Sequence, residues 1–234
     1  MWANRRLLHL AAGFLAGLAL LALSAGALHA LLRSEMFPLR RVELTAPAQH
    51  LTREQVEAAV RGRITGNFFA VDVASVRAAV EALPWVRRAA VRRVWPDLLE
   101  VTVEEHVPLA RWGDGELVNI HGERFAGRVE MTLPLLVGPP GAEGEVARQY
   151  LRFAAAVAPL GTALERVVLT PRFAWQLRLA NGLHLMLGRD AGQAEARLRR
   201  FIEIYPAVEK TRPHEYVDLR YPNGFALRLP DSRS

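Results

Sequence analysis

The chain begins with a long apolar segment. No charged residue lies between Arg6 and Arg33, and residues 7–32 read LLHLAAGFLAGLALLALSAGALHALL. As a helix rising 1.5 Å per residue, this segment would extend about 39 Å, which exceeds the roughly 30 Å of a hydrocarbon core. The pattern predicts a transmembrane helix over residues 7–32, preceded by a short cytoplasmic tail over residues 1–6.

A cleaved signal peptide is the alternative interpretation of this segment, because Ala25-Gly26-Ala27 has the small residues of a processing site. Against it, the apolar stretch before that site is longer than a usual signal core, and apolar residues continue after it. Arginines flank the segment on both sides, so the positive-inside rule does not decide its orientation. Long domains translocate with little regard to charge, and we therefore expect a single-pass type II protein with its C-terminal part outside the cytoplasm.

Residues 37–112 alternate between short strand patterns and short helix patterns. RRVELTA alternates as a strand, and Thr52 with Gln55 forms a capping box that opens a helix. A second helix follows between Asp72 as its N-cap and Pro84 at its end. VRRAAVRRVW and LLEVTVEE then alternate with period two around a Pro-Asp turn, as in a hairpin with one solvated face. The order strand, helix, helix, strand, strand predicts two helices on a small three-stranded sheet.

Residues 113–230 mix helices and strands in a second domain. Apolar residues at helical spacing predict one helix over about residues 145–158 and another that Pro206 ends. Between these helices, VVLTPRFAWQLRLANGLHLMLG is a hairpin pattern whose Asn-Gly pair suits a type I′ turn. The region closes with YVDLRY, a turn and FALRL, so the last strand is expected over residues 225–229.

Composition narrows the chemistry that the chain can perform. With 234 residues, 51% hydrophobic and 23% charged, the chain has the balance of a folded protein of one or two domains. It has no cysteine, which excludes disulfides, thiolate metal sites and cysteine nucleophiles. It has only five serines, and Ser75 alone falls in the expected folded structure, so a serine hydrolase is disfavoured. The net charge of +6 suits nucleic acid, anionic lipid or an acidic protein, and composition does not choose among them.

The densest basic cluster lies in VRRAAVRRV and has two interpretations. Its arginines can form a solvated strand face opposite the glutamates of the next strand, or they can bind an acidic partner or lipid headgroups. The cluster comprises Arg87, Arg88, Arg92 and Arg93.

Sequence motifs for catalysis are weak. Glu104 and Glu105 should point to opposite faces of a strand, which argues against a joint site with His106. Residues 138–144 make a poor phosphate loop, because prolines remove backbone donors and no GK[ST] follows. Neither HExxH nor GxSxG occurs. We therefore expect no enzymatic activity, no cofactor and no metal.

Several segments resemble one known family. FPLRRVELTA, and then GNFFAVDVASVRAAVEALPWVRRAAVRRVWPDLLEVTVEEHVPLARW, resemble the POTRA domain of the FtsQ/DivIB family of bacterial cell division proteins. FIEIYP and YVDLRYPNGFALRL are similar to the last motifs of that family. The resemblance implies an α+β protein with one transmembrane helix, a β-α-α-β-β POTRA domain over residues 37–112 and a C-terminal β-domain over residues 113–230. That β-domain is an antiparallel sheet with packed helices, whereas the cytoplasmic tail is shorter than in many members.

The resemblance also implies a function. Members are essential cell-division scaffolds, anchored in the inner membrane with their C-terminal part in the periplasm at the division septum. They link early and late divisome proteins by binding FtsB and FtsL, and they help to control septal peptidoglycan assembly. Further implied partners are FtsK, FtsW and FtsI, with recruitment through the first strand and second helix of the POTRA domain. An exported domain does not meet nucleic acid, so we expect no such partner.

The last strand is the candidate binding element. An edge strand exposes a row of unpaired amide and carbonyl groups, so an incoming segment can extend the sheet. By resemblance, this edge receives a strand of FtsB while basic and aromatic residues nearby hold acidic groups of the partner. The implied partner-binding residues are Arg172, Arg220, Tyr221, Phe225, Ala226, Leu227, Arg228 and Leu229.

Two other classes of function remain as alternatives. A POTRA-containing transport or assembly factor would carry a membrane barrel, for which the region after the POTRA domain offers no suitable series of strands. A membrane-tethered periplasmic enzyme would show a convergent pocket with perturbed acids.

Overall fold

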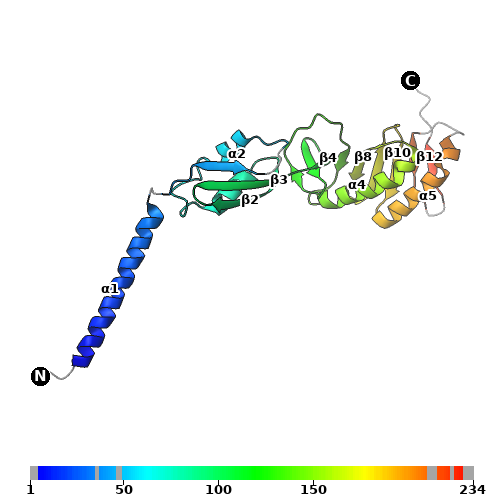
Figure 1. Cartoon of the computed structure of the whole chain (residues 1–234). Coiled ribbons are helices and arrows are strands. Elements are labelled where there is room, and N and C mark those ends of the chain that lie inside the picture. Colours follow the sequence, from blue (N-terminus) through cyan, green and yellow to red (C-terminus); the bar gives the residue numbers. More distant parts are fainter. Residues whose placement is uncertain (1–4, 35–36, 46–48, 210–214, 222–223, 229–234) are drawn as a thin grey trace. The chain divides into compact units, whose positions relative to one another are not determined.

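The structure is a computed structural model that describes residues 5–34, 37–45, 49–209, 215–221 and 224–228 (Figure 1). The chain divides into two compact units, Met1–Glu105 and His106–Ser234. Each unit has its own hydrophobic core, and no residue belongs to both cores.

The first unit opens with helix α1, Arg5–Arg33. Its stretch Leu8–Leu31 is long and apolar enough to cross a membrane, with a mean hydropathy of 2.0, and none of this stretch is buried inside the protein. The helix agrees in position with the apolar segment predicted over residues 7–32.

The rest of the first unit is a three-stranded sheet covered by two helices, as the sequence predicts. The capping box of Thr52 and Gln55 opens α2, and the Asp72 side chain accepts a hydrogen bond from the amide of Ala74 at the start of α3. The sheet order is β1-β3-β2, in which β1 runs parallel and β2 antiparallel to β3. The elements are β1 (Arg41–Leu44), α2 (Arg53–Val60), α3 (Val73–Glu81), β2 (Val86–Val94) and β3 (Leu98–Glu105).

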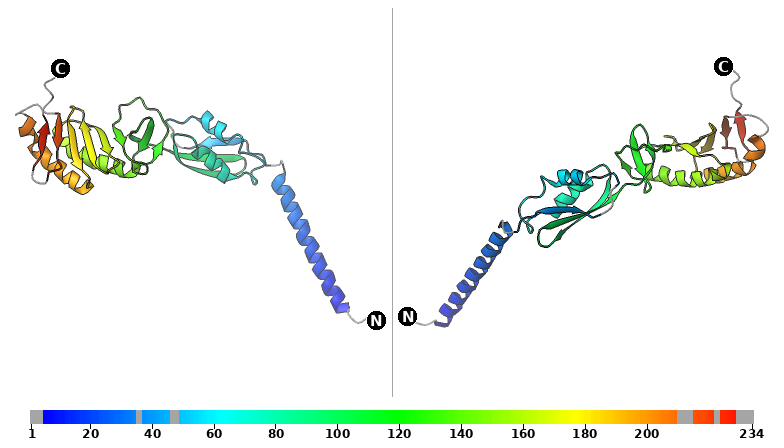
Figure 2. Two further views of the ribbon diagram at one scale, coloured as in Figure 1. Left: turned by 180° about the vertical axis from the view of Figure 1, so that it is seen from behind. Right: turned by 45° about the horizontal axis from the view of Figure 1, so that its top comes forward.

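The second unit is built on one nine-stranded sheet with the order β12-β11-β10-β9-β8-β7-β4-β5-β6. Helices α4 and α5 lie along one face of this sheet (Figure 2), and the core between them contains Phe153, Trp175, Leu198 and Phe201. The elements are β4 (Pro108–Trp112), β5 (Glu116–Asn119), β6 (Arg124–Phe125), β7 (Leu135–Val137), α4 (Glu143–Val157), the 3-10 helix η1 (Ala158–Leu160), β8 (Leu164–Leu169), β9 (Trp175–Leu179), β10 (His184–Gly188), α5 (Ala191–Glu209), β11 (Tyr216–Asp218) and β12 (Ala226–Arg228).

This sheet is mixed, whereas an antiparallel sheet was expected. The pairs β4 with β7, β7 with β8 and β10 with β11 are parallel, and the other pairs are antiparallel. Parallel neighbours need a crossover connection rather than a tight turn. Helix α4 supplies it between β7 and β8, and α5 supplies it between β10 and β11.

Two expected boundaries also differ from the structure. The first domain was expected to end at Trp112, but β4 pairs with β5 and β7 in the second sheet, so the division falls after Glu105. Helix α5 was expected to stop at Pro206 and continues to Glu209. A proline removes only its own amide donor from the helix, and the residues after it can still close the last turn.

Candidate functional site

Strand β12 forms one edge of the second sheet. It pairs antiparallel with β11, with Leu227 opposite Val217, and no other described strand pairs with it. Ala226, Leu227 and Arg228 are all exposed, and 39% of the Leu227 surface remains accessible. We call the outer side of Ala226–Arg228 the terminal edge. Leu229, which was expected to extend this strand, lies outside the described residues.

Next to this edge, the buried carboxylate of Asp218 in β11 is paired with the exposed side chain of Arg220. The Asp218 carboxylate is 7% exposed and accepts hydrogen bonds from Nε and Nη2 of Arg220 at 2.9 and 2.6 Å, and from the Arg220 amide at 3.0 Å. The Arg220 side chain lowers the pKa of Asp218, against the opposing effect of burial. Part of the guanidinium of Arg220 is therefore already occupied, while its remaining N–H groups stay available on an exposed side chain.

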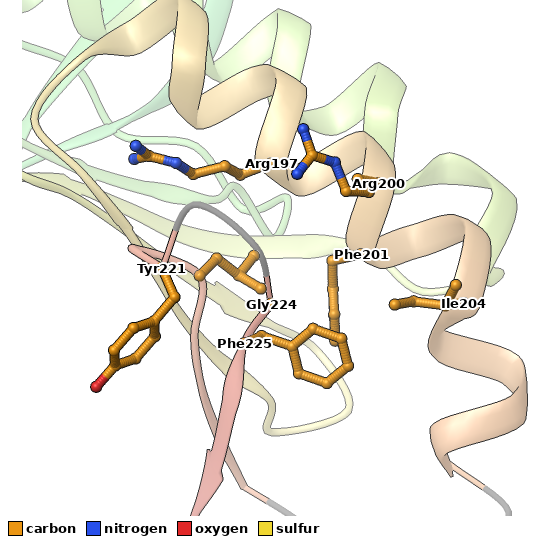
Figure 3. A pocket seen from close by; sticks show the side chains of 8 residues that line it. Arg197, Arg200, Phe201, Ile204, Tyr221, Gly224 and Phe225 are labelled. Atoms are coloured by element: carbon orange, nitrogen blue, oxygen red, sulfur yellow. The ribbon is translucent and has the colours of Figure 1, made fainter.

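A groove lies between α5 and the segment that joins β11 to β12 (Figure 3). It has a volume of about 200 Å³. The ring of Phe225 faces Phe201 at a centroid distance of 5.3 Å, whereas the ring of Tyr221 points away from them. Arg197 is fixed at the rim by a hydrogen bond from Nη1 to the Leu187 carbonyl oxygen at 2.9 Å. We call this site the terminal groove; its lining residues are Arg197, Arg200, Phe201, Ile204, Leu219, Tyr221, Gly224 and Phe225.

The terminal groove combines an apolar floor with a basic rim. Phe201 is buried and Ile204 is 43% exposed, so the floor offers apolar surface to a visiting side chain. Arg197 and Arg200 supply positive charge beside it. The arrangement can hold an apolar side chain that has an acidic neighbour.

Arg172 lies in the turn between β8 and β9 and is exposed. The turn is held by Thr170, whose Oγ1 accepts a hydrogen bond from the Ala174 amide at 3.0 Å. The next residue, Trp175, pairs with Gly188 at the end of β10, and a Cβ at Gly188 would lie 3.5 Å from the Arg220 side chain. Arg172 and Arg220 therefore lie at the same end of the sheet.

Sequence reasoning missed three contributors to this surface. Phe173, next to Arg172, has a φ of 58° and is 57% exposed. Only its position in a turn that contains proline could have predicted this exposure. Ile204 lies outside the apolar stripe of α5. Its position on the helix could therefore have predicted that its side chain is exposed. No sequence pattern indicated the role of Asp218. Its side chain reaches Arg220, two positions later, only because strand β11 ends at Asp218.

The acidic motif Glu104-Glu105-His106 forms no joint site. Glu104 pairs with Arg87 at 2.6 Å, and His106 lies 2.8 Å from the Asn119 side chain. Glu105 accepts backbone hydrogen bonds from residues 49–51 instead. Burial raises the pKa of Glu105, and these hydrogen bonds outweigh it, so the pKa lies below its ordinary value.

No catalytic constellation emerges from the part of the chain that the structure describes. Within that part no group of three or more His, Cys, Asp or Glu residues could hold a metal ion. Every carboxyl group there whose pKa departs from its ordinary value has it lowered, whereas a carboxyl group that serves as a general acid needs it raised. In the arginine cluster, Arg92 is exposed and pairs with Glu100, as the solvated-face interpretation expects. The side chain of Arg87 pairs with Glu104 but is only 10% exposed, and Arg93 donates to the Val71 carbonyl oxygen, so that interpretation describes only part of the cluster.

Comparison with known proteins gives consistent matches along the chain. The family model "POTRA domain, FtsQ-type" matches residues 37–106, and "Cell division protein FtsQ/DivIB, C-terminal" matches residues 110–220. Similar proteins include the cell division protein FtsQ of Burkholderia pseudomallei, 42% identical over 100% of this chain and 96% of the relative. FtsQ of Nitrosospira multiformis is 39% identical, covering 97% of this chain and 99% of the relative, and FtsQ of Escherichia coli is 33% identical, covering 83% and 74%.

Proposed function

Because the chain belongs to the FtsQ/DivIB family of bacterial cell division proteins, we propose that it is a membrane-anchored divisome scaffold that captures a partner strand at its terminal edge. The family is one of non-enzymatic scaffolds, so the activity of the chain is binding rather than catalysis. The partner we propose is FtsB, together with FtsL. By this capture the chain helps to control septal peptidoglycan assembly.

The single observation that carries the proposal is the position of β12 at the end of the sheet order. A strand at an edge offers main-chain donors and acceptors along its outer side, and an added strand obtains affinity from those hydrogen bonds. Ala226 and Leu227, whose side chains point to opposite faces of β12, are both exposed. The short length of the strand limits the number of backbone bonds, and side-chain contacts must supply the selectivity.

The terminal groove supports a specific chemistry for the partner strand. Alternate side chains of an added strand point to one face, where α5 and Phe225 form the groove. We propose that one apolar side chain of FtsB enters the groove and that acidic groups nearby contact Arg197, Arg200 or Arg220. Arg172, at the same end of the sheet, extends this basic surface toward the preceding part of the partner.

Helix α1 supports the membrane location. Its stretch Leu8–Leu31 can cross a bilayer once, and we propose that it anchors the chain in the inner membrane with both folded units in the periplasm at the division septum. We further propose FtsK, FtsW and FtsI as divisome partners. Recruitment through β1 and α3 of the POTRA domain stays a proposal from the family resemblance.

Proline substitution tests the capture of a strand. Neighbouring residues of a strand direct their amides to opposite sides. One of the two substitutions, Ala226→Pro or Leu227→Pro, therefore removes a donor on the outer side of β12, and the other removes a donor on the side of β11. Loss of one backbone hydrogen bond at about 1 kcal/mol predicts roughly fivefold weaker binding of FtsB by the affected variant. Binding is measured with the full chain in detergent against purified FtsB–FtsL.

Leu227→Ala is the matched control, because it shortens the same side chain and keeps the amide. Thermal unfolding verifies that each proline variant remains folded. If both proline variants bind FtsB as tightly as the parent chain, capture at the terminal edge is wrong.

A further inference from the structure

The first unit carries an exposed aromatic cluster that the proposed binding of FtsB does not use. Phe37, Phe69 and Trp95 come from three separate segments and contact one another, with ring centroids 5.5 Å apart for Phe37 and Phe69 and 5.6 Å for Phe37 and Trp95. Phe68, which is buried, adds edge contacts to Phe69 and Trp95. Trp95 is nevertheless 60% exposed and Phe69 39% exposed, so the rings form an apolar surface rather than a closed core. We call Phe37, Phe69 and Trp95 the aromatic cap.

The covalent chain keeps this cap close to the end of α1. Phe37 follows Ser34 by three residues, and three extended residues span at most about 11 Å. Ser34 in turn lies three residues after Leu31, the last residue of the membrane-crossing stretch. Wherever that stretch leaves the hydrocarbon core, Phe37 must therefore lie within or next to the headgroup layer.

Asn67 ties the loop of Phe69 to the same place. Its side chain is 4% exposed, and Nδ2 donates to the carbonyl oxygens of Ser34 at 2.8 Å and Leu31 at 3.4 Å. Its Oδ1 accepts from the amides of Phe69 and Ala70, both at 3.0 Å. One amide group thus joins the end of α1 to the loop that presents Phe69. The Phe68 amide also donates to the Phe37 carbonyl oxygen at 2.8 Å.

The turn that carries Trp95 lies at the same end of the three-stranded sheet. The amides of Arg40 and Arg41, which lead into β1, both donate to the Asp97 carbonyl oxygen. The Asp97 carboxylate is paired with Arg41 at 2.8 Å, so the turn next to Trp95 presents no unpaired negative charge toward a lipid surface. Arg40 is exposed beside this pair.

We propose that the aromatic cap inserts into the headgroup layer of the membrane that holds α1 and docks the POTRA domain onto that membrane. The inference rests on the proposed membrane anchor, and it adds a second attachment to the first. Tryptophan favours the membrane interface, where its apolar body and its polar N–H group can both be satisfied, and the phenylalanine rings add apolar surface that can be buried at the headgroup boundary. Arginine beside the rings suits the phosphates of anionic lipids.

A lipid-borne quencher tests this docking with the full chain in vesicles of phosphatidylethanolamine and phosphatidylglycerol. The chain has no cysteine, so Ala70→Cys places a single fluorescent label next to Phe69, in an exposed position. Ala82→Cys is the matched control, also exposed, near the end of the domain where Val86 pairs with Glu105. We expect a headgroup-attached nitroxide lipid to quench the label at position 70 and to leave the label at position 82 unquenched.

Two variants of the Ala70→Cys chain test the cause. Combining Phe69→Ser with Trp95→Ser removes the rings, and Asn67→Ala keeps the rings but removes the tie to α1. We expect both to lose most of the quenching, and thermal unfolding reports whether the domain remains folded. Vesicle flotation measures membrane anchoring separately. A chain that is anchored by α1 alone still floats with the vesicles, although its label is not quenched.

The outcomes separate the two hypotheses. A chain that does not float contradicts the membrane anchor and the docking together. A chain that floats while the labels at positions 70 and 82 respond equally overturns the docking alone. Disulfide cross-linking between two Ala70→Cys chains, without lipid quenching, would show that a second copy covers the cap and would also overturn the proposal.

Discussion

Asp218 and Arg220 act as a unit at the edge of the second sheet. The sequence motif VDLRY suggested Arg220 as a residue that contacts a partner, yet its guanidinium already forks onto a carboxylate that is 7% exposed. A buried carboxylate that loses its partner costs more than a surface ion pair contributes. Arg220 therefore has a structural role at the same position where a binding role is proposed.

Arg220→Ala should weaken both the fold and the binding of FtsB. The unpartnered Asp218 carboxylate is expected to lower the free energy of unfolding by about 1–3 kcal/mol, measured by urea unfolding of the full chain in detergent. Asp218→Asn together with Arg220→Ala should recover part of that stability, because no buried charge remains. Loss of FtsB binding by Arg220→Ala with unchanged stability would mean that Arg220 acts on the partner alone.

A pH series provides the control for this pair. Because Arg220 lowers the pKa of Asp218, the pair contributes stability that is present above the unfolded pKa of an aspartate, about 3.9, and is lost as pH falls through the folded value. The stability difference between the parent chain and Asp218→Asn should therefore be largest near neutral pH and should begin to shrink only as the pH falls below about 4, through the lowered pKa of Asp218. A difference that grows as the pH falls would contradict the assignment.

The backbone conformation at Gly122 requires glycine. It has a φ of 80° in the turn before β6, and a Cβ there would lie 2.5 Å from the Cα of Gly144 at the start of α4. Gly122→Ala should destabilise the second unit by more than the roughly 1–2 kcal/mol of a left-handed residue, since the backbone of α4 must also shift. Gly141→Ala is the matched control, with a φ of 83° and open space around its Cβ. Equal losses in urea unfolding would contradict the close approach.

At the scale of elements, local patterns predicted most helices and strands but not their neighbours. The capping box at Thr52 and the alternation of LLEVTVEE describe contacts within a few residues, which short-range chemistry fixes. The mixed sheet depends on crossovers through α4 and α5, whose direction no local pattern encodes. The terminal groove forms where α5 contacts a segment about twenty residues later in the chain, and the sequence did not predict this contact. The sequence did predict β12 as the last strand.

Ile204 tests whether the terminal groove takes part in binding. Its side chain is 43% exposed, so Ile204→Ser should cost little stability while removing apolar surface from the groove. Loss of one buried aliphatic contact predicts roughly tenfold weaker binding of FtsB. Leu151→Ser is the matched control, because Leu151 is 48% exposed on α4 and does not line the groove. Equal affinities for the two variants would separate the groove from the binding site.

At the scale of the whole molecule, the two units have separate cores around different helices. Leu99 belongs to the core of the first unit and Leu198 to that of the second, and both side chains are fully buried. A domain with its own core can unfold as its own cooperative unit. The proposed capture of FtsB at β12 then requires only the second unit to be folded.

Leu99→Ala and Leu198→Ala make this separation measurable, since each should destabilise its own unit by about 2–5 kcal/mol. In amide hydrogen exchange of the full chain, we expect Leu99→Ala to accelerate exchange in β2 and β3 only, and Leu198→Ala to accelerate it in α5 and the neighbouring strands only. Under conditions where the altered unit is largely unfolded, FtsB binding should persist in Leu99→Ala and fall in Leu198→Ala. If either substitution accelerates exchange in both units, the units unfold together, and capture at the terminal edge would depend on the POTRA domain as well.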